Sequence, residues 1–410
     1  MKLFFLCLLL TIVLITPLTA APAETETITH CPHIIPILRE NDQKVNKYIG
    51  TKDILYQNGW YYTVILWDML QDKGWAQQYR TDTAAQIQVF TKTWKPVWNG
   101  PLIPINYQVT RSHLPAKVPK SLDPAIFPRL LPGKEDGPCP FWLGFNWYLL
   151  CVDADLKPVH NKTFELPFTA RDYLQVNDRI FALGEFQGKF IHELALPSQK
   201  IIHSFLSKKE LVERLEITNK DWGIDSGLVG IAPDGNKGFF CNLRPLAVVV
   251  FQWNTGKILS VQPIPTEALP PTARTFHNVY WSSFDILGKR LRAWLVLQDY
   301  MTFQEFQKEY PRAARRMAQR WLKNKGRLPE FNRILKMPKV MGLAINIQLN
   351  GRLAGWAIMK IPEKTPDGTV FFSPPFSHVR LPAPKERFGW VSIHSTDGPS
   401  IRRRVALCRW

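Results

Sequence analysis

An apolar run that ends in two carboxylates occupies the stretch Trp147-Tyr148-Leu149-Leu150-Cys151-Val152-Asp153-Ala154-Asp155-Leu156-Lys157-Pro158. Asp153 and Asp155 follow the run directly, and a polar turn comes next. Paired carboxylates after a buried strand are typical of a divalent-cation site in a sugar transferase, because hard oxygen ligands suit such a cation. The same pattern is also typical of a hairpin turn in an antiparallel β protein. The surrounding sequence has to separate these two interpretations.

Similar strand-and-turn units continue from Phe141 to about Ile264. The apolar runs are Trp147–Val152, Arg179–Leu183, Phe190–Leu196, Gly227–Ile231, Leu246–Phe251 and Ile258–Pro263. The turns between them combine Gly with Asn or Asp, as in Asn254-Thr255-Gly256-Lys257, and these residues tolerate a positive φ. Because hairpins follow one another without helices, the pattern predicts a mainly β protein with an antiparallel meander. We expect a β-propeller, with a barrel or sandwich as the alternatives.

The transferase interpretation requires a second feature in the sequence. Such an enzyme needs a mononucleotide-binding half in which strands and helices alternate. Residues 24–140 show no such alternation, so the hairpin interpretation of Asp153-x-Asp155 is favoured. No cofactor is predicted, and a divalent cation is the alternative if these two carboxylates bind metal.

The N-terminus has the pattern of a secretory signal peptide. Lys2 precedes the apolar run Leu3–Ile15, and Pro17 and the small residues Ala20–Ala23 follow. A basic start, a short apolar run and small residues describe a cleavable signal over residues 1–23. An uncleaved anchor is the alternative. The prediction is therefore a secreted or periplasmic protein.

Export changes the interpretation of the cysteines, because disulfides persist in oxidising compartments. The chain has 6 cysteines, and removal of Cys7 with the signal leaves an odd number. These are Cys31, Cys139, Cys151, Cys241 and Cys408. Two disulfides and one spare thiol are allowed, and Cys139 with Cys151, on either side of one predicted strand, is the simplest pair. The remaining connectivity is open. His30-Cys31-Pro32-His33 suggests a tethered N-terminal segment rather than a metal site.

Composition divides the chain into regions. Residues 24–140 are rich in aromatic residues and proline. The dense prolines of 100–140 exclude long helices and central strands. Because Leu and Ile recur between these prolines, an ordered meander is favoured over a domain boundary. Residues 141–300 are the predicted β meander. Residues 301–410 are predicted to combine a basic helix with C-terminal hairpins, including Asn350-Gly351 and a last strand near Trp390–His394.

The basic helix begins at a capping box formed by Thr302 and Glu305. An apolar stripe with helical spacing follows, and it comprises Phe303, Phe306, Tyr310, Ala314, Met317 and Trp321. Pro311 should kink or divide the helix. The opposite face includes Arg315, Arg316 and Arg320. The net charge of +18 suggests an anionic neighbour for this face, such as a polymer or a membrane surface. A solvated face on a helix packed by its aromatics is the simpler alternative.

The candidate functional residues lie in turns of the β meander and on the basic helix. The candidate catalytic carboxylates are Asp153, Asp155 and Asp172, and the candidate binding residues are Trp222, Arg171, Arg315, Arg316 and Arg320. A carboxylate pair can cleave glycosides, and a tryptophan can stack on a sugar ring. The alternative is that Arg171 and Asp172 form an ion pair and that Trp222 is a core residue.

Three hypotheses follow. The first is an exported protein that binds or processes glycans. The second is a non-enzymatic protein that binds an anionic polymer or membrane through its basic helix. The third is a metal-dependent glycosyltransferase. No specific nucleic-acid partner is expected. Whether the protein is an enzyme, and its oligomeric state, are left open by the sequence.

Overall fold

The computed structural model describes most of the chain between residues 30 and 409. The described residues are 30–35, 47–69, 83–105, 128–134, 137–159, 162–217, 228–232, 234–243, 245–271, 278–287, 290–309, 311–323, 327, 337–359, 364–365, 368–372, 377–378, 388–395 and 402–409. The predicted signal peptide (1–23), most of the Pro-rich segment (106–127) and Trp222 lie outside them.

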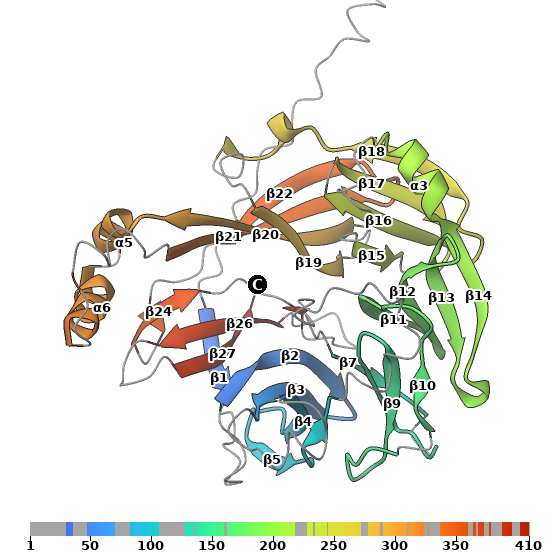
Figure 1. Cartoon of the computed structure of the whole chain (residues 1–410). Helices are drawn as coiled ribbons and strands as arrows, with labels where there is room; N and C mark the ends of the chain where they lie inside the picture. Colours follow the sequence, from blue (N-terminus) through green and yellow to red (C-terminus); the bar gives the residue numbers. More distant parts are fainter. Residues whose placement is uncertain are drawn as a thin grey trace, which may run out of the picture.

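The described strands form six antiparallel sheets arranged around a common centre (Figure 1). The first sheet contains β2 (Lys47–Gln57), β3 (Trp60–Asp68), β4 (Thr83–Phe90) and β5 (Pro96–Asn99), with β6 (Ile103–Pro104) beside β4. The second contains β7 (Arg129–Pro132), β8 (Phe141–Gly144), β9 (Tyr148–Val152) and β10 (Phe164–Glu165). The third contains β11 (Asp172–Val176), β12 (Arg179–Phe186), β13 (Lys189–Ala195) and β14 (Lys200–Ser207).

The remaining sheets follow the same plan. The fourth contains β15 (Leu228–Ile231), β16 (Lys237–Leu243), β17 (Leu246–Gln252) and β18 (Ile258–Pro263). The fifth contains β19 (Asn278–Leu287), β20 (Arg290–Met301), β21 (Met337–Gln348) and β22 (Leu353–Met359). The sixth contains β23 (Lys364–Thr365), β24 (Gly368–Phe372), β25 (Ser377–His378), β26 (Phe388–Ser395) and β27 (Arg402–Arg409), together with β1 (His30–Ile35).

In each of the first five sheets, the first strand faces the centre (Figure 1). In the first five sheets the strands run outward in sequence order, and the inner strands of neighbouring sheets meet: β2 contacts β7, β7 contacts β11, and β15 contacts β19. In the sixth sheet β24 and β25 pair with consecutive parts of β26, and β23 lies beyond β24. β25 contacts both β19 and β2, so the ring closes between the fifth and first sheets. This is a six-sheet β-propeller, as the hairpin pattern predicts.

The two ends of the chain meet in the sixth sheet. β1 pairs with β27 and forms its outer edge. The His30-Cys31-Pro32-His33 segment is therefore tethered by strand pairing. The strand expected near Trp390–His394 is β26, but it is not the last strand. β27 (Arg402–Arg409) follows it and was not predicted.

The cores lie between neighbouring sheets, and the run Leu149–Val152 shows how. Leu150 and Val152 pack against the first sheet, whereas Leu149 and Cys151 pack against the third. Because successive strand residues point to opposite faces, an unbroken apolar run is required wherever both faces are covered. Burial of each large apolar side chain stabilises the fold by about 1.5–3 kcal/mol relative to leaving that side chain exposed.

The predicted basic helix is divided at Pro311. α5 spans Phe303–Glu309 and α6 spans Pro311–Lys323, and both lie at the far end of the long β20–β21 hairpin (Figure 1). The capping box is present: the Thr302 amide donates to Glu305 Oε2 at 2.7 Å, and the Glu305 amide donates to Thr302 Oγ1 at 3.2 Å. Phe303, Phe306 and Ala314 are buried, as the apolar stripe predicts.

A third helix, α3 (Lys208–Arg214), and two short 3-10 helices, η2 (Leu196–Ser198) and η4 (Thr266–Ala268), connect strands. In the described part of the chain, no helix has the length and apolar character needed to cross a bilayer.

Candidate functional site

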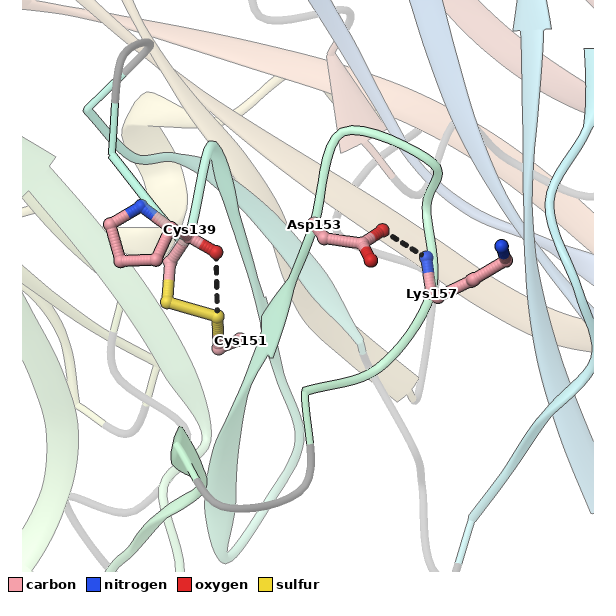
Figure 2. Close-up of a disulfide and its surroundings, with 5 residues drawn as sticks. Cys139, Cys151, Asp153 and Lys157 are labelled. Carbon is pink, nitrogen blue, oxygen red and sulfur yellow. Dashed lines mark hydrogen bonds between the residues drawn. A yellow bond between two sulfur atoms is a disulfide. The ribbon is translucent and has the colours of Figure 1, made fainter.

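The turn after β9 is closed by Asp153. Its Oδ1 accepts a hydrogen bond from the Lys157 amide at 2.8 Å (Figure 2), and its own amide donates to the Lys157 carbonyl at 3.0 Å. Asp155 lies at the tip with a side chain that is 70% exposed, and one of its oxygens is 3.4 Å from Lys157 Nζ. Asp153 therefore shapes the turn, while Asp155 is available to solvent.

Leu156 packs this turn against the first sheet. Its φ is +57°, yet its side chain is buried, and it lies where Gly100 leaves room: a Cβ built on Gly100 would be 2.9 Å from Leu156 Cβ. The Gly100 carbonyl accepts from Gln86 Nε2 at 2.9 Å, and Gln86 Oε1 accepts from Trp67 Nε1 at 2.9 Å. A buried hydrogen-bond chain thus holds the strand end on which the turn rests.

The same contact recurs around the ring. Gly256, between β17 and β18, approaches the backbone of Leu206 in the third sheet, and Gly351, between β21 and β22, approaches Val250 in the fourth. Turns between third and fourth strands therefore pack on the preceding sheet. Leu156, Gly256 and Gly351 all have positive φ. This shared architecture explains the Asp153–Lys157 turn without a metal ion.

A disulfide fixes the strand that delivers the turn. Cys139 and Cys151 are bonded, with Cα atoms 5.2 Å apart (Figure 2). The bond links the segment before β8 to the third strand of the same sheet, and it confirms the pairing that the spacing suggested. The thiol of Cys241 is free and buried, and burial raises its pKa above the ordinary value.

Two exposed tryptophans lie on the first sheet, against which Leu156 of the turn packs. Trp98 in β5 and Trp60 in β3 are 40% and 39% exposed. Trp98 pairs with Val89, which pairs with Tyr62, two residues from Trp60. Directly paired residues share a face of a sheet, so both indoles belong to the face that packs on the second sheet. We call Trp60, Trp98, Asp155 and Lys157 the aromatic rim.

Asp172 lies elsewhere, at the centre of the ring. Arg129 in β7 donates to its Oδ1 and Oδ2, from Nε at 2.5 Å and from Nη2 at 3.1 Å. On its other side Arg129 Nη1 is 3.4 Å from Oδ1 of Asp53 in β2, and Asp53 Oδ2 accepts from the Leu130 amide at 2.7 Å. We call Asp53, Arg129 and Asp172 the central clamp, because it links the inner strands of three consecutive sheets.

The charges of the central clamp are arranged around one cation. Asp53 is fully buried, while the side chains of Arg129 and Asp172 are 16% and 23% exposed. Burial by itself would lower the pKa of Arg129, but the carboxylates of Asp172 and Asp53 outweigh it and raise that pKa. The guanidinium stays charged, and a bidentate bond of this kind is geometrically specific. The clamp is suited to holding sheets together.

The other candidate residues are dispersed. Arg171 is exposed and precedes the central clamp, and Arg315 is exposed on α6. Arg316 and Arg320 belong to α6, but their side chains, like all of Trp222, are outside the described part. In the described residues no three His, Cys, Asp or Glu side chains gather as a metal site would require. Nor do those residues contain the alternating strand–helix half that the glycosyltransferase hypothesis needs.

The chain matches no family model and no curated protein. Solved structures resemble it at 10% identity. Hydrazine synthase from Kuenenia stuttgartiensis aligns over 88% of this chain and 80% of its own with a TM-score of 0.43. A member of the DUF4221 family from Bacteroides vulgatus aligns over 90% and 94%, also at 0.43. The periplasmic gluconolactonase PpgL of Pseudomonas aeruginosa aligns over 86% and 83% at 0.39. The propeller assignment rests on the sheet order above.

Sequence analysis missed the aromatic rim and the central clamp. The signal for the rim was Trp98 directly before the Asn99-Gly100-Pro101 turn, because a turn beside an edge strand leaves its flanking residues at the surface. No local pattern marks Asp53 or Arg129, since their relationship depends on which strands become neighbours at the centre.

Proposed function

We propose that the protein is an exported β-propeller that binds glycans at the aromatic rim. The observation that carries the proposal is the exposure of Trp60 and Trp98 on the face of the first sheet against which Leu156 of the Asp153–Lys157 turn also packs. Large apolar side chains exposed in a group, with polar neighbours, are typical of binding surfaces. This proposal replaces Trp222 with Trp98 as the principal stacking residue.

The chemistry of the rim suits a carbohydrate. An indole offers a flat apolar face to the C–H side of a pyranose ring and keeps a polar N–H for hydrogen bonding. Asp155 can accept hydrogen bonds from sugar hydroxyls, and bonds to a charged group contribute about 1.5–3 kcal/mol. Lys157 adds a donor that favours a glycan carrying carboxylate or sulfate groups.

The turn geometry favours binding without a catalytic role for Asp153, since that carboxylate is engaged by the Lys157 amide. Asp172 is likewise engaged by Arg129. Of Asp153, Asp155 and Asp172, Asp155 has the carboxylate that is most accessible to a ligand. Export is supported by the signal-like N-terminus and by the disulfide, which persists in an oxidising compartment.

A glycan array followed by calorimetry on the selected ligand tests the proposal. Trp98→Ala should weaken binding by about two- to twelvefold, because an aromatic stacking contact is worth about 0.5–1.5 kcal/mol. Asp155→Asn should weaken it less. Leu259→Ala is the matched control, because Leu259 is a similarly exposed apolar residue on β18 of the fourth sheet. Absence of glycan binding, or equal loss in Leu259→Ala, contradicts the proposal.

A second function is favoured by the exposed face of α6. Ala314 is buried while Arg315 and Lys323 are exposed, so the helix turns cations outward. We propose that this face binds an anionic polymer or membrane surface. Charge reversal of Arg315, Arg316 and Arg320 should abolish binding to heparin or to phosphatidylserine vesicles at low salt, and wild-type binding should fall as salt rises. Salt-independent binding, or binding unchanged by the reversal, would exclude it.

A further inference from the structure

The strand pairing that closes the ring places two cysteines opposite each other. His30 pairs with Arg409, and His33 pairs with Leu407, with a bulge between these two pairs. Cys31 and Pro32 on β1 therefore lie opposite the single residue Cys408 on β27. Pro32 suits this place because a bulge on an edge strand does not need its missing amide hydrogen.

We propose that Cys31 and Cys408 form a disulfide that covalently closes the propeller. Regularly paired residues of an antiparallel ladder have Cα atoms about 4.5–5.5 Å apart. At a bulge two residues of one strand face one residue of the other, so Cys31 is placed close to Cys408, and a disulfide spans Cα separations of about 4.4–6.8 Å. Cys139 and Cys151, which are bonded in this protein, have a Cα separation of 5.2 Å. Opposed residues also share one face of the sheet.

Elimination of the other cysteines gives the same pair. Cys139 and Cys151 are bonded to each other, and Cys241 is buried in the fourth sheet, in the core it forms with the fifth. Cys7 belongs to the predicted signal. Cys31 and Cys408 remain, at opposite ends of the sequence and in one pair of strands. The tether suggested by His30-Cys31-Pro32-His33 thus becomes a covalent one.

The bond forms by thiol–disulfide exchange with a disulfide oxidant of the export compartment. The two thiols lose two electrons and two protons, an S–S bond forms, and the oxidant's disulfide is reduced to two thiols. The resulting loop contains almost the whole chain. In the chain-entropy account, closing a long loop restricts the unfolded state more than closing a short one.

The bond protects the part of the ring that depends on strand pairing alone. The first five sheets are each built from consecutive segments, whereas the sixth combines β1 with β27 from opposite ends of the chain. Separation of β1 would leave β27 with an unpaired edge. A covalent link across this pair prevents the first step of ring opening.

Peptide mapping of the exported full-length protein tests the proposal. Without reductant, trypsin should release a linked species that joins the peptide ending at Arg39 to Val405–Arg409, and reduction should separate it. In denaturant before reduction, one thiol should be alkylated, that of Cys241. Alkylation of Cys31 and Cys408 in the exported protein, or a link from either to another cysteine, overturns the proposal.

Variants supply a second test. Cys31→Ser should leave Cys408 open to alkylation, and Cys408→Ser should do the same for Cys31, so each single variant gains one reactive thiol. Cys241→Ala is the matched control: it should remove the reactive thiol and keep the linked peptide. The double variant Cys31→Ser with Cys408→Ser should unfold at a temperature several degrees lower. An unchanged thiol count in either single variant overturns the proposal, and the peptide map of the wild type requires no variant to fold.

Discussion

Arg129 binds both oxygens of Asp172 and so joins the inner strands of the second and third sheets. The same guanidinium reaches Asp53 in the inner strand of the first sheet. Three sheets that are separate in sequence share one cation at the centre. Asp53 is fully buried, and Arg129 and the Leu130 amide are two of the groups that compensate its charge.

Arg129→Met should lower the free energy of unfolding by about 3–5 kcal/mol, because it leaves a buried carboxylate without its cation. The midpoint and slope of a urea denaturation curve measure this loss. Lys200→Met is the control, because Lys200 is exposed on β14 and substitutions of exposed residues are usually within about 0.5 kcal/mol. A loss in Arg129→Met no larger than that of the control would contradict a role for the central clamp in joining the sheets.

Gly256→Ala should destabilise the protein more than Gly235→Ala. The two glycines have nearly the same φ, +71° and +69°, but a Cβ on Gly256 would lie 2.2 Å from the Leu206 amide nitrogen, whereas one on Gly235 meets nothing within 4 Å. Each variant should lose about 1–2 kcal/mol from the left-handed backbone, and Gly256→Ala should lose at least about 1–3 kcal/mol more from the forced separation of the third and fourth sheets. Chemical denaturation of both variants measures the difference. Equal losses would show that the turn does not have to approach the preceding sheet.

The sequence predicted the propeller through features that are local. Asn254-Thr255-Gly256-Lys257 forms the expected turn, and the runs Leu246–Phe251 and Ile258–Pro263 form β17 and β18. A hairpin depends on turn chemistry and on alternation over a few residues, so a single sequence contains that information. β14 and β16 were missed because exposed residues in β14, and Lys237 and Gly238 at the start of β16, weaken the apolar pattern of these strands.

The candidate site was less predictable because its parts meet only in three dimensions. Asp153 and Asp155 are two residues apart, yet one closes the turn and the other faces solvent. Asp172 is bound by Arg129, which lies 43 residues earlier in the sequence. The fit of Leu156 over Gly100 likewise depends on the packing of two sheets, for which no local pattern exists.

Removal of the Cys139–Cys151 bond should loosen the strand that carries the Asp153–Lys157 turn. Replacement of both cysteines by serine should lower the free energy of unfolding by about 2–4 kcal/mol, the range for loops of this length. Replacement of both by alanine is the companion variant, because it separates loss of the bond from the cost of burying a serine hydroxyl at position 151. Urea denaturation measures both variants. If only the serine pair is destabilised, the buried hydroxyl and not the lost bond is responsible.

His192 should make the stability of the protein depend on pH. Its Nε2 donates to the Gly184 carbonyl at 2.9 Å, so its Nδ1, 2.8 Å from Ser204 Oγ, accepts in the neutral ring. Burial lowers the pKa of His192 below its ordinary value of 6.5, although the Gly184 and Lys189 backbones oppose this change. The unfolded chain therefore binds a proton at higher pH than the folded one. The stabilising contribution is complete above pH 6.5 and is lost as the pH falls from there through the folded pKa, by about 1.4 kcal/mol for each unit that separates the two pKa values.

His192→Gln removes this titration and should flatten the curve of unfolding free energy against pH between about 7.5 and 5. Urea denaturation at each pH gives the curve. His203→Gln is the matched control, because His203 lies on the neighbouring strand β14 with an exposed ring, and its curve should keep the slope of the wild type. A wild-type slope in His192→Gln would show that the acid sensitivity arises from other groups, whereas a slope lost in His203→Gln would assign it to the exposed ring.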